Sequence, residues 1–196
     1  MNDWERLNIL DVIEEVGEAS CQRLLDSYVC PINPEVEHFL KTQALEFAKQ
    51  RITITYLVVC RRGNRLHLLG YFALANKFVQ IDKDSLSKTV VRKISKFARY
   101  DPDLHCYQLA MPLIAQLGRN FAPDLPERVK GGQLLDLACD RVLEAERILG
   151  GKTVYLEYND EPKLTEFYTQ SAFRIFGSRM SSAGDGQQLT QAFRYF

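Results

Sequence analysis

The stretch from Leu109 to Leu135 constrains the fold of this 196-residue chain more than any other. It opens with an apolar run, Leu109–Gly118, which predicts a buried strand. A loop containing Pro, Asp, Arg and Lys follows, ends in Gly131-Gly132 and leads into a pattern that predicts an amphipathic helix. The first N–H groups of a helix lack intrahelical partners and lie at the positive end of its dipole. This order therefore favours a phosphate-binding cradle, with a plain turn as the simpler alternative.

Hydrophobic periodicity predicts alternating helices and strands along the rest of the chain. Asn33 as N-cap and Pro34 at the first position begin a helix predicted over 34–49. Ile52–Cys60 and Leu66–Ala75 form a predicted hairpin, whose second arm can continue to Ile81. The remaining predicted elements are a strand or helical turn at 7–16, helices at 18–28, 85–99, 132–149 and from 162, and strands at 152–158, 173–176 and 189–196. The fold class is therefore α/β with a mixed sheet.

Length and composition favour one domain over residues 1–196 in a soluble protein of the cytoplasm. Lys plus Arg equals Asp plus Glu at 25 each, so no basic excess favours a dedicated DNA binder. The five cysteines are odd in number and form no C-x-x-C pair, which favours reduced thiols. The N-terminus has no signal-peptide pattern, and no apolar run reaches about 18 residues, so we expect no membrane association.

Four motifs, in this order, resemble the GNAT superfamily of N-acetyltransferases, and within it the bacterial toxin-type branch. The resemblance extends from Asn33 to Phe196. Its motifs are Pro34–Leu45 followed by Thr55-Tyr-Leu57, Pro112–Arg119 with its Leu-Gly-Arg ending, Gly131–Ala138 after the pyrophosphate loop, and Glu166–Phe173 for the Phe-Tyr-x-x-x-Gly-Phe pattern. The family resemblance implies a mixed, mostly antiparallel central sheet flanked by helices, with residues 85–100 as an additional helix.

The resemblance also implies a function: transfer of acetyl from acetyl-CoA to a primary amine by direct attack. It assigns the pyrophosphate of the cofactor to the backbone of the loop before the helix that starts near Gly132. It assigns the thioester carbonyl to main-chain groups just after Pro112–Arg119, which matches the family's fourth strand, and the role of general acid to Tyr168. Asn159 is near the family's cofactor-contacting Asn. The loop residues are Arg128, Val129, Lys130, Gly131, Gly132 and Gln133, and the strand-end residues are Asn120, Phe121 and Ala122. The chain departs from the family where Arg128, Val129 and Lys130 replace glycines and where Ala172 replaces Gly.

The acceptor amine must be neutral before it attacks. A lysine amine near pKa 10.4 costs about 4.6 kcal/mol to deprotonate at pH 7, whereas an α-amine near 8 costs about 1.4 kcal/mol. Only a lysine-like acceptor therefore needs a strong general base. Glu157 is the first candidate, with His105 and Tyr107 behind it, although Glu157 is equally readable as a solvated carboxylate or a helix cap. Cys106 is more readily a buried thiol than a nucleophile, and no spacing indicates a metal site.

Several alternatives remain at this stage. The acceptor can be a small molecule, a peptide or an aminoacyl-tRNA, and the family branch allows a homodimer or an antitoxin partner. A binding or regulatory module of the same fold, without turnover, is the alternative from another functional class. The basic face formed by Lys88, Arg92, Lys96 and Arg99 suits an RNA backbone but also an ordinary solvated helix face.

Overall fold

The β-branched and apolar residues that follow residue 53 form a long antiparallel hairpin. Its arms are β2 (Ile54–Arg62) and β3 (Arg65–Asp82), and Gly63 takes the positive φ of 57° that the turn requires. The structure is a computed structural model that describes residues 4–181 and 186–196. The predicted hairpin is confirmed, and its second arm extends to Asp82.

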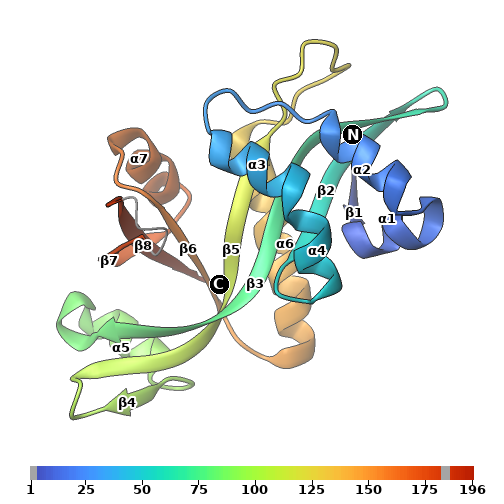
Figure 1. The fold of residues 1–196 in the computed structure, drawn as a ribbon. Helices are drawn as coiled ribbons and strands as arrows, with labels where there is room; N and C mark the ends of the chain where they lie inside the picture. Colours follow the sequence, from blue (N-terminus) through green and yellow to red (C-terminus); the bar gives the residue numbers. More distant parts are fainter. Residues whose placement is uncertain (1–3, 182–185) are drawn as a thin grey trace. The chain divides into compact units, whose positions relative to one another are not determined.

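The hairpin belongs to an eight-stranded sheet with the order β1-β2-β3-β5-β6-β8-β7, in which β4 pairs with β5 (Figure 1). The pairs β1–β2, β2–β3, β4–β5, β6–β8 and β7–β8 are antiparallel. The remaining strands are β1 (Trp4–Asn8), β4 (Arg99–Asp101), β5 (Cys106–Arg119), β6 (Thr153–Asn159), β7 (Arg174–Met180) and β8 (Gln188–Tyr195). The predicted mixed, mostly antiparallel sheet with flanking helices is confirmed.

The chain divides into two compact units. The first contains Met1–Ala75 and Ile114–Asp140, and the second contains Asn76–Leu113 and Arg141–Phe196. Three elements, β3, β5 and α6, contribute residues to both units. The helices are α1 (Ile9–Val16), α2 (Glu18–Asp26), α3 (Pro34–Thr42), α4 (Ala44–Lys49), α5 (Lys88–Ile94), α6 (Gly131–Leu149) and α7 (Pro162–Gln170), with a 3-10 turn at Lys83–Ser85. One domain over 1–196 stays a prediction.

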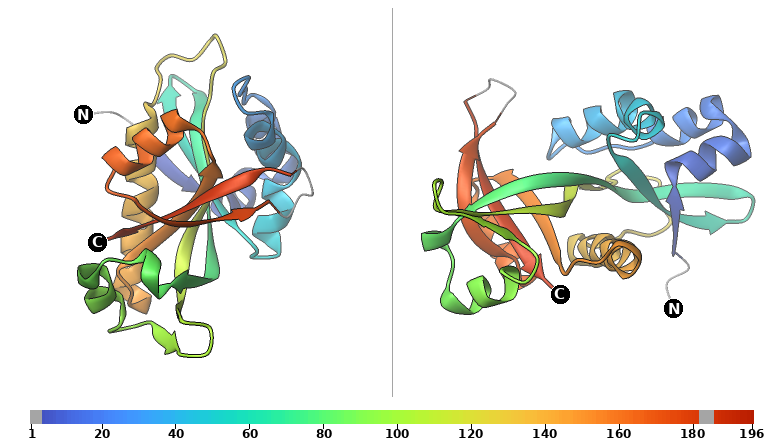
Figure 2. Two further views of the ribbon diagram at one scale, coloured as in Figure 1. Left: turned by 90° about the vertical axis from the view of Figure 1, so that its left-hand side faces the viewer. Right: turned by 90° about the horizontal axis from the view of Figure 1, so that it is seen from below.

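In the first unit, helices cover both faces of the strands. Helices α1 to α4 lie on one face of β2 and β3, and the first part of α6 lies on the other (Figure 2). Tyr71 on β3 joins the core of the first face: its hydroxyl donates to the Val36 carbonyl at 2.6 Å, and its ring packs against Tyr28 and Phe39. On the opposite face, Arg6 of β1 donates to the Leu137 carbonyl of α6.

The second unit has its own apolar core beneath α5. Val90 and Ile94 of this helix are buried against Tyr155, Phe176 and other apolar side chains of the strands. The predicted helix over 85–99 is wrong in length, because the chain leaves α5 after Ile94 and pairs with β5 as β4. Phe97, beyond the end of α5, is 41% exposed and stacks on Tyr195.

The predicted helix over 34–49 is also divided. Asn33 caps α3 as predicted, since its side chain accepts from the N–H groups of Glu35 and Val36. The helical path stops at Gln43, whose φ of −120° is outside the helical range, and α4 begins at Ala44.

All five cysteines are free and buried, so none of them is a surface thiol.

Gly118 on β5 permits the closest packing in the first unit. A Cβ atom at this position would overlap both Tyr28 Oη and Val36 Cγ1 and would lie 3.2 Å from Tyr71 Cε1. On β3, a Cβ at Gly70 would lie 2.8 Å from the Gly118 carbonyl oxygen. The glycine of the Leu-Gly-Arg motif is therefore required by the helical layer that packs against the strand.

We expect Gly118→Ala to lower the free energy of unfolding by roughly 1–3 kcal/mol, because the methyl group displaces buried side chains. Urea unfolding followed by circular dichroism measures the change. Gly132→Ala is the matched control, since a Cβ there meets nothing within 4 Å, and it should stabilise α6 by roughly 0.5–1 kcal/mol. Equal stability of Gly118→Ala and the wild type would contradict this account of the packing.

Candidate active site

The residues of the predicted phosphate cradle lie in the first unit, where the loop after β5 leads into α6 (Figure 1). Val129 anchors this loop: it is 2% exposed, and its side chain packs beside Gly70 of β3. Val129 therefore fixes the loop and offers a ligand almost no exposed surface. Arg128 is exposed and donates to the Ala122 carbonyl at 3.3 Å, so its guanidinium folds back over the loop.

The N-terminus of α6 combines a fixed start with open donors. Lys130 is the N-cap, because the Leu134 N–H donates to its carbonyl, and the Gln133 side chain accepts from the Lys130 N–H at 2.9 Å. Among the described residues, the N–H groups of Gly131, Gly132 and Gln133 have no hydrogen-bond acceptor, and all three residues are partly exposed. These donors, at the positive end of a 19-residue helix, suit an anionic group.

Asn120 has a different role from the one expected. Its N–H donates to the Leu69 carbonyl, and its side chain donates to the Leu68 carbonyl while accepting from Val29 and Ala122. The Phe121 N–H in turn donates to the Val29 carbonyl at 2.8 Å. The N–H groups of Asn120, Phe121 and Ala122 are all engaged within the protein. Each could polarise a thioester carbonyl only by giving up an internal bond.

Tyr168 lies in an aromatic cluster of the second unit. Its ring is 4.7 Å from that of Tyr158, 5.0 Å from Phe167 and 5.9 Å from Phe173, measured between centroids. Burial, with a smaller contribution from Tyr158, raises the pKa of Tyr168 to about 12. Within the part of the chain that the structure describes, its hydroxyl has no hydrogen-bond partner. A neutral, uncommitted phenol is suited to donate a proton.

Ala172, which replaces the family's Gly after Tyr168, has a φ of 65°. This backbone conformation is one that L side chains rarely adopt and that glycine adopts without strain. The family's preference for Gly therefore has a local physical reason, and this chain tolerates Ala in the same turn.

Glu157 is engaged by four donors. Arg179 pairs with both carboxylate oxygens, at 2.6 Å from Nε and 2.5 Å from Nη2, and Gln191 Nε2 lies 3.0 Å from Oε1. The Tyr155 hydroxyl also donates to this carboxylate. Burial alone raises the pKa of Glu157, but the hydrogen bonds from Arg179, Tyr155 and Gln191 outweigh it and hold the pKa below its ordinary value. Glu157 could serve as a general base only by breaking this network.

No local sequence pattern predicts the partners of Glu157. Arg179 is on β7, Gln191 on β8 and Glu157 on β6, and only the strand order brings them to one place. The other candidate bases are also committed, because His105 contacts Tyr100 and Asp84 and Tyr107 is buried in the apolar core.

The predicted site residues therefore fall into two groups. The strand-end and loop residues belong to the first unit, and Glu157, Asn159 and Tyr168 belong to the second. Asn159 ends β6, is partly exposed, and uses its backbone to pair with β8. In the described ranges, no group of three or more His, Cys, Asp or Glu side chains could hold a metal ion.

Comparison with solved structures gives matches over nearly the whole chain. AtaT complexed with acetyl-methionyl-tRNAfMet has a TM-score of 0.66 at 15% identity, over 96% of this chain and 94% of AtaT. A tyrosine-to-phenylalanine variant of KacT has a TM-score of 0.63 at 16% identity, over 97% of this chain and 94% of KacT. The chain has the fold of AtaT and KacT.

A further match is a variant AtaT toxin bound to the C-terminus of the antitoxin AtaR and acetyl-CoA. Its TM-score is 0.61 at 16% identity, and the match covers 99% of this chain and 94% of that one. No family model matches the sequence, and no curated protein does so either. None of the described helices combines the length and apolar character needed to cross a membrane.

We expect Glu157→Gln to reduce the free energy of unfolding at pH 7 by roughly 1–3 kcal/mol, because Arg179 loses its ionic partner. The folded-state pKa of Glu157 is lowered, so its contribution is present above the unfolded-state value and is lost as the pH falls through the folded-state value. Wild type and variant should therefore converge in acid. Denaturant unfolding at a series of pH values measures this. Glu166→Gln, on the exposed face of α7, is the control, and a constant difference between wild type and Glu157→Gln at every pH would contradict the assignment.

Proposed function

We propose that this chain is an acetyl-CoA-dependent N-acetyltransferase that transfers acetyl to a primary amine by direct attack. The observation that carries the proposal is the set of three open N–H donors at the start of α6, in a chain with the fold of AtaT. One AtaT structure is bound to acetyl-CoA. Acetyl-CoA supplies an acetyl group activated as a thioester. The protein supplies the anion-binding site and a proton donor.

The pyrophosphate of the cofactor is assigned to the N–H groups of Gly131, Gly132 and Gln133. Because Gly132 faces open space, the backbone at this position can approach a phosphate closely. Lys130 is exposed beside these donors and adds positive charge, as does Arg128. These side chains compensate for the glycines that the loop lacks. We also assign Asn159 as a residue that contacts the cofactor.

Tyr168 is assigned the role of general acid. In the reaction the amine nitrogen forms a bond to the acetyl carbon, the carbon–sulfur bond breaks, and the departing thiolate takes a proton from the Tyr168 hydroxyl. The proton that the amine nitrogen loses passes to water, and a proton from water restores the Tyr168 hydroxyl. Since the pKa of Tyr168 is about 12, the phenol is protonated throughout the physiological range. Structures of both KacT and AtaT have been solved with a tyrosine changed to phenylalanine, the same substitution that tests this role here.

The acceptor is assigned as an α-amine. Glu157, His105 and Tyr107 are each committed to other contacts, so the chain offers no strong base among the candidates. Without one, an α-amine near pKa 8 is favoured over a lysine amine by about 3 kcal/mol at pH 7. An aminoacyl-tRNA presents such an α-amine, and AtaT has been solved with an acetylated one. By analogy, we propose aminoacyl-tRNA as the substrate and an antitoxin as the partner.

Isothermal titration with acetyl-CoA tests the cradle. We expect Gly132→Glu to weaken binding by at least about tenfold, because like charges about 4 Å apart near a protein surface repel by roughly 4 kcal/mol. The variant should remain folded, since position 132 is open and a carboxylate is favourable at a helix N-terminus. Gly132→Ala, the neutral control, should bind nearly as the wild type does. Equal binding by the glutamate and alanine variants would place the cofactor elsewhere. No binding by the wild type would favour the regulatory module.

Tyr168→Phe should lower kcat by about 100-fold or more while changing the Kd for acetyl-CoA little, because general acid catalysis contributes about 10²–10⁴ to rate. Tyr158→Phe is the matched control, since it removes a hydroxyl from the neighbouring ring. Release of CoA measures the rate. Parallel losses of kcat and affinity in Tyr168→Phe, or a larger rate loss in Tyr158→Phe, would contradict the assignment.

The acceptor assignment predicts that an aminoacyl-tRNA is acetylated and free lysine is not acetylated on its side chain. The rate should rise about tenfold per pH unit below the acceptor's pKa and level off near pH 8, because only the neutral amine attacks. Mass spectrometry of the acceptor measures both. Side-chain acetylation of lysine at a comparable rate would contradict the α-amine assignment.

If the protein is a toxin, its expression should arrest growth, and Tyr168→Phe should relieve the arrest. Harmless expression of the active enzyme would count against the toxin role.

A further inference from the structure

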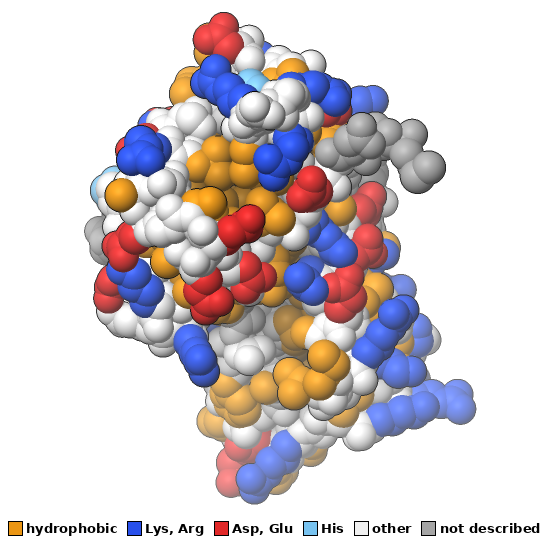
Figure 3. Space-filling model, turned by 90° about the vertical axis from the view of Figure 1, so that its right-hand side faces the viewer, with side chains coloured by type: hydrophobic (Ala, Val, Ile, Leu, Met, Phe, Trp, Pro, Cys, Tyr) orange, Lys and Arg blue, Asp and Glu red, His pale blue; other side chains and the backbone are white. Residues whose placement is uncertain are grey.

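Charge is unevenly distributed along the sequence. On the face that Figure 3 shows, acidic and basic side chains are interspersed, in keeping with their equal numbers. The segment 86–99 differs, because it contains five Lys or Arg residues and no Asp or Glu. It includes α5, which lies in the second unit.

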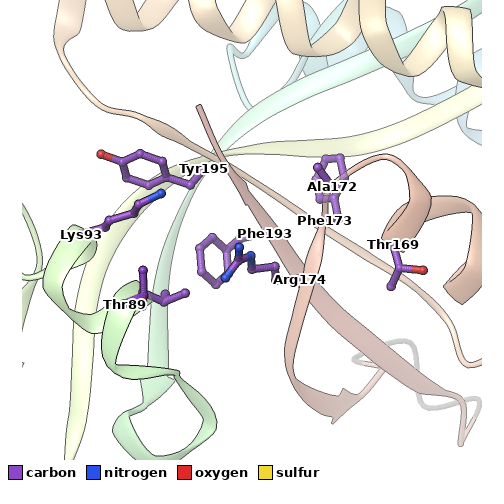
Figure 4. Close-up of a pocket in the computed structure, with 9 residues that line it drawn as sticks. Thr89, Lys93, Thr169, Ala172, Phe173, Arg174, Phe193 and Tyr195 are labelled. Carbon is purple, nitrogen blue, oxygen red and sulfur yellow. The ribbon is translucent and has the colours of Figure 1, made fainter.

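A cavity of about 350 Å³ lies beside α5, entirely within the second unit (Figure 4). Thr89 and Lys93 line it from α5; four residues apart, they share one side of the helix. Thr169 lines it from the end of α7, and Arg174 from the start of β7. None of the residues assigned to acetyl-CoA is among the lining residues.

The polar lining of this cavity selects an anion. It has two basic residues, Lys93 and Arg174, and three hydroxyl groups, those of Thr89, Thr169 and Tyr195, and none of its nine lining residues is acidic. Lys93 is held at the wall, since its Nζ lies 4.6 Å from the centroid of the Tyr195 ring. The Thr169 hydroxyl already donates to the Thr165 carbonyl at 2.7 Å, so the donors left for a ligand include those of Lys93, Arg174 and Thr89. A Lys, an Arg and a hydroxyl group lining one space match the several acceptor oxygens of a phosphate better than the two of a carboxylate.

The apolar residues that line the cavity indicate what chemical group of the ligand lies beside the phosphate. Val90, Phe173, Phe193 and Tyr195 are its apolar lining residues; Phe173 and Phe193 are 2% and 1% exposed, and Tyr195 is the aromatic residue that stays partly exposed. The volume is at the lower end of the range for pockets that hold organic ligands, so it has room for more than a phosphate. Aromatic side chains beside cations are the combination that binds a nucleotide, through its base and its phosphate.

We propose that this cavity binds a nucleotide, with the phosphate between Lys93 and Arg174 and the base against the partly exposed Tyr195. The nucleotide can be free or part of a nucleic acid strand, since the chemistry of recognition is the same. The basic segment 86–99 would draw a strand toward the cavity, whereas a free nucleotide needs the cavity alone. The proposal does not depend on acetyl transfer.

Isothermal titration with CMP tests the proposal, with inorganic phosphate and a ten-nucleotide single-stranded RNA as further probes. CMP avoids the adenine of CoA, and repeating the titration in Gly132→Glu excludes binding at the cradle. The test variant combines Lys93→Gln and Arg174→Gln. The control combines Arg92→Gln and Lys96→Gln, which removes two cations from the same segment outside the cavity lining.

We expect CMP to bind the wild type and Gly132→Glu alike, at least about tenfold more weakly to the cavity variant, and within about threefold of the wild type to the control. RNA that depends on the cavity and binds more tightly than CMP would identify a strand as the ligand, and equal affinities would identify the free nucleotide. Equal losses in both double variants, inorganic phosphate binding as tightly as CMP, or no binding of CMP or RNA would overturn the proposal. If the cavity variant does not fold, amide chemical shifts of the wild type with CMP decide: changes at Thr89 and Thr169 support the site, and changes confined elsewhere overturn it.

Discussion

The candidate active site depends on how Asn120 fixes the end of β5. A bulge in β3 places Val58 opposite Gly70 and Val59 opposite Leu68, so Leu69 is the extra residue. The bulge presents two successive carbonyl groups, of Leu68 and Leu69, to the side chain and N–H of Asn120. The same side chain binds the loop before α3 through the Val29 N–H. These bonds set where the chain leaves the sheet, and hence where the loop to α6 begins.

The loop beyond Asn120 is held by packing and leaves its donors open. Val129 is buried beside Gly70, and Gln133 closes the N-cap at Lys130. The helix start is therefore rigid before any ligand arrives, which reduces the ordering cost of binding. In the second unit, Glu157 is paired with Arg179, while the Tyr168 hydroxyl has no hydrogen-bond partner among the described residues. In the proposed mechanism this contrast would supply an acid without a strong base, which favours an acceptor that loses its proton easily.

Local patterns predicted most of the fold. The Asn33 cap, the hairpin and the amphipathic pattern after Gly132 each act over a few residues, so sequence spacing captured them. Pairing between distant strands was not predictable from local sequence patterns. Because residues 99–101 pair with β5 as β4, α5 is shorter than predicted, and the strand order β6-β8-β7 places Arg179 beside Glu157. Of the candidate site, the glycines at the helix start were predictable from helix chemistry. The internal bonds of Asn120 required the bulge in β3, for which the sequence has no local signal.

The central claim is that the N-terminus of α6 holds the pyrophosphate of acetyl-CoA. A crystal structure of the protein soaked with acetyl-CoA tests it most directly. The account predicts pyrophosphate oxygens within about 3 Å of the N–H groups of Gly131, Gly132 and Gln133, with the hydrogen bonds of Asn120 unchanged. Pyrophosphate bound away from α6, or three donors that stay uncontacted in a fully occupied complex, would contradict it.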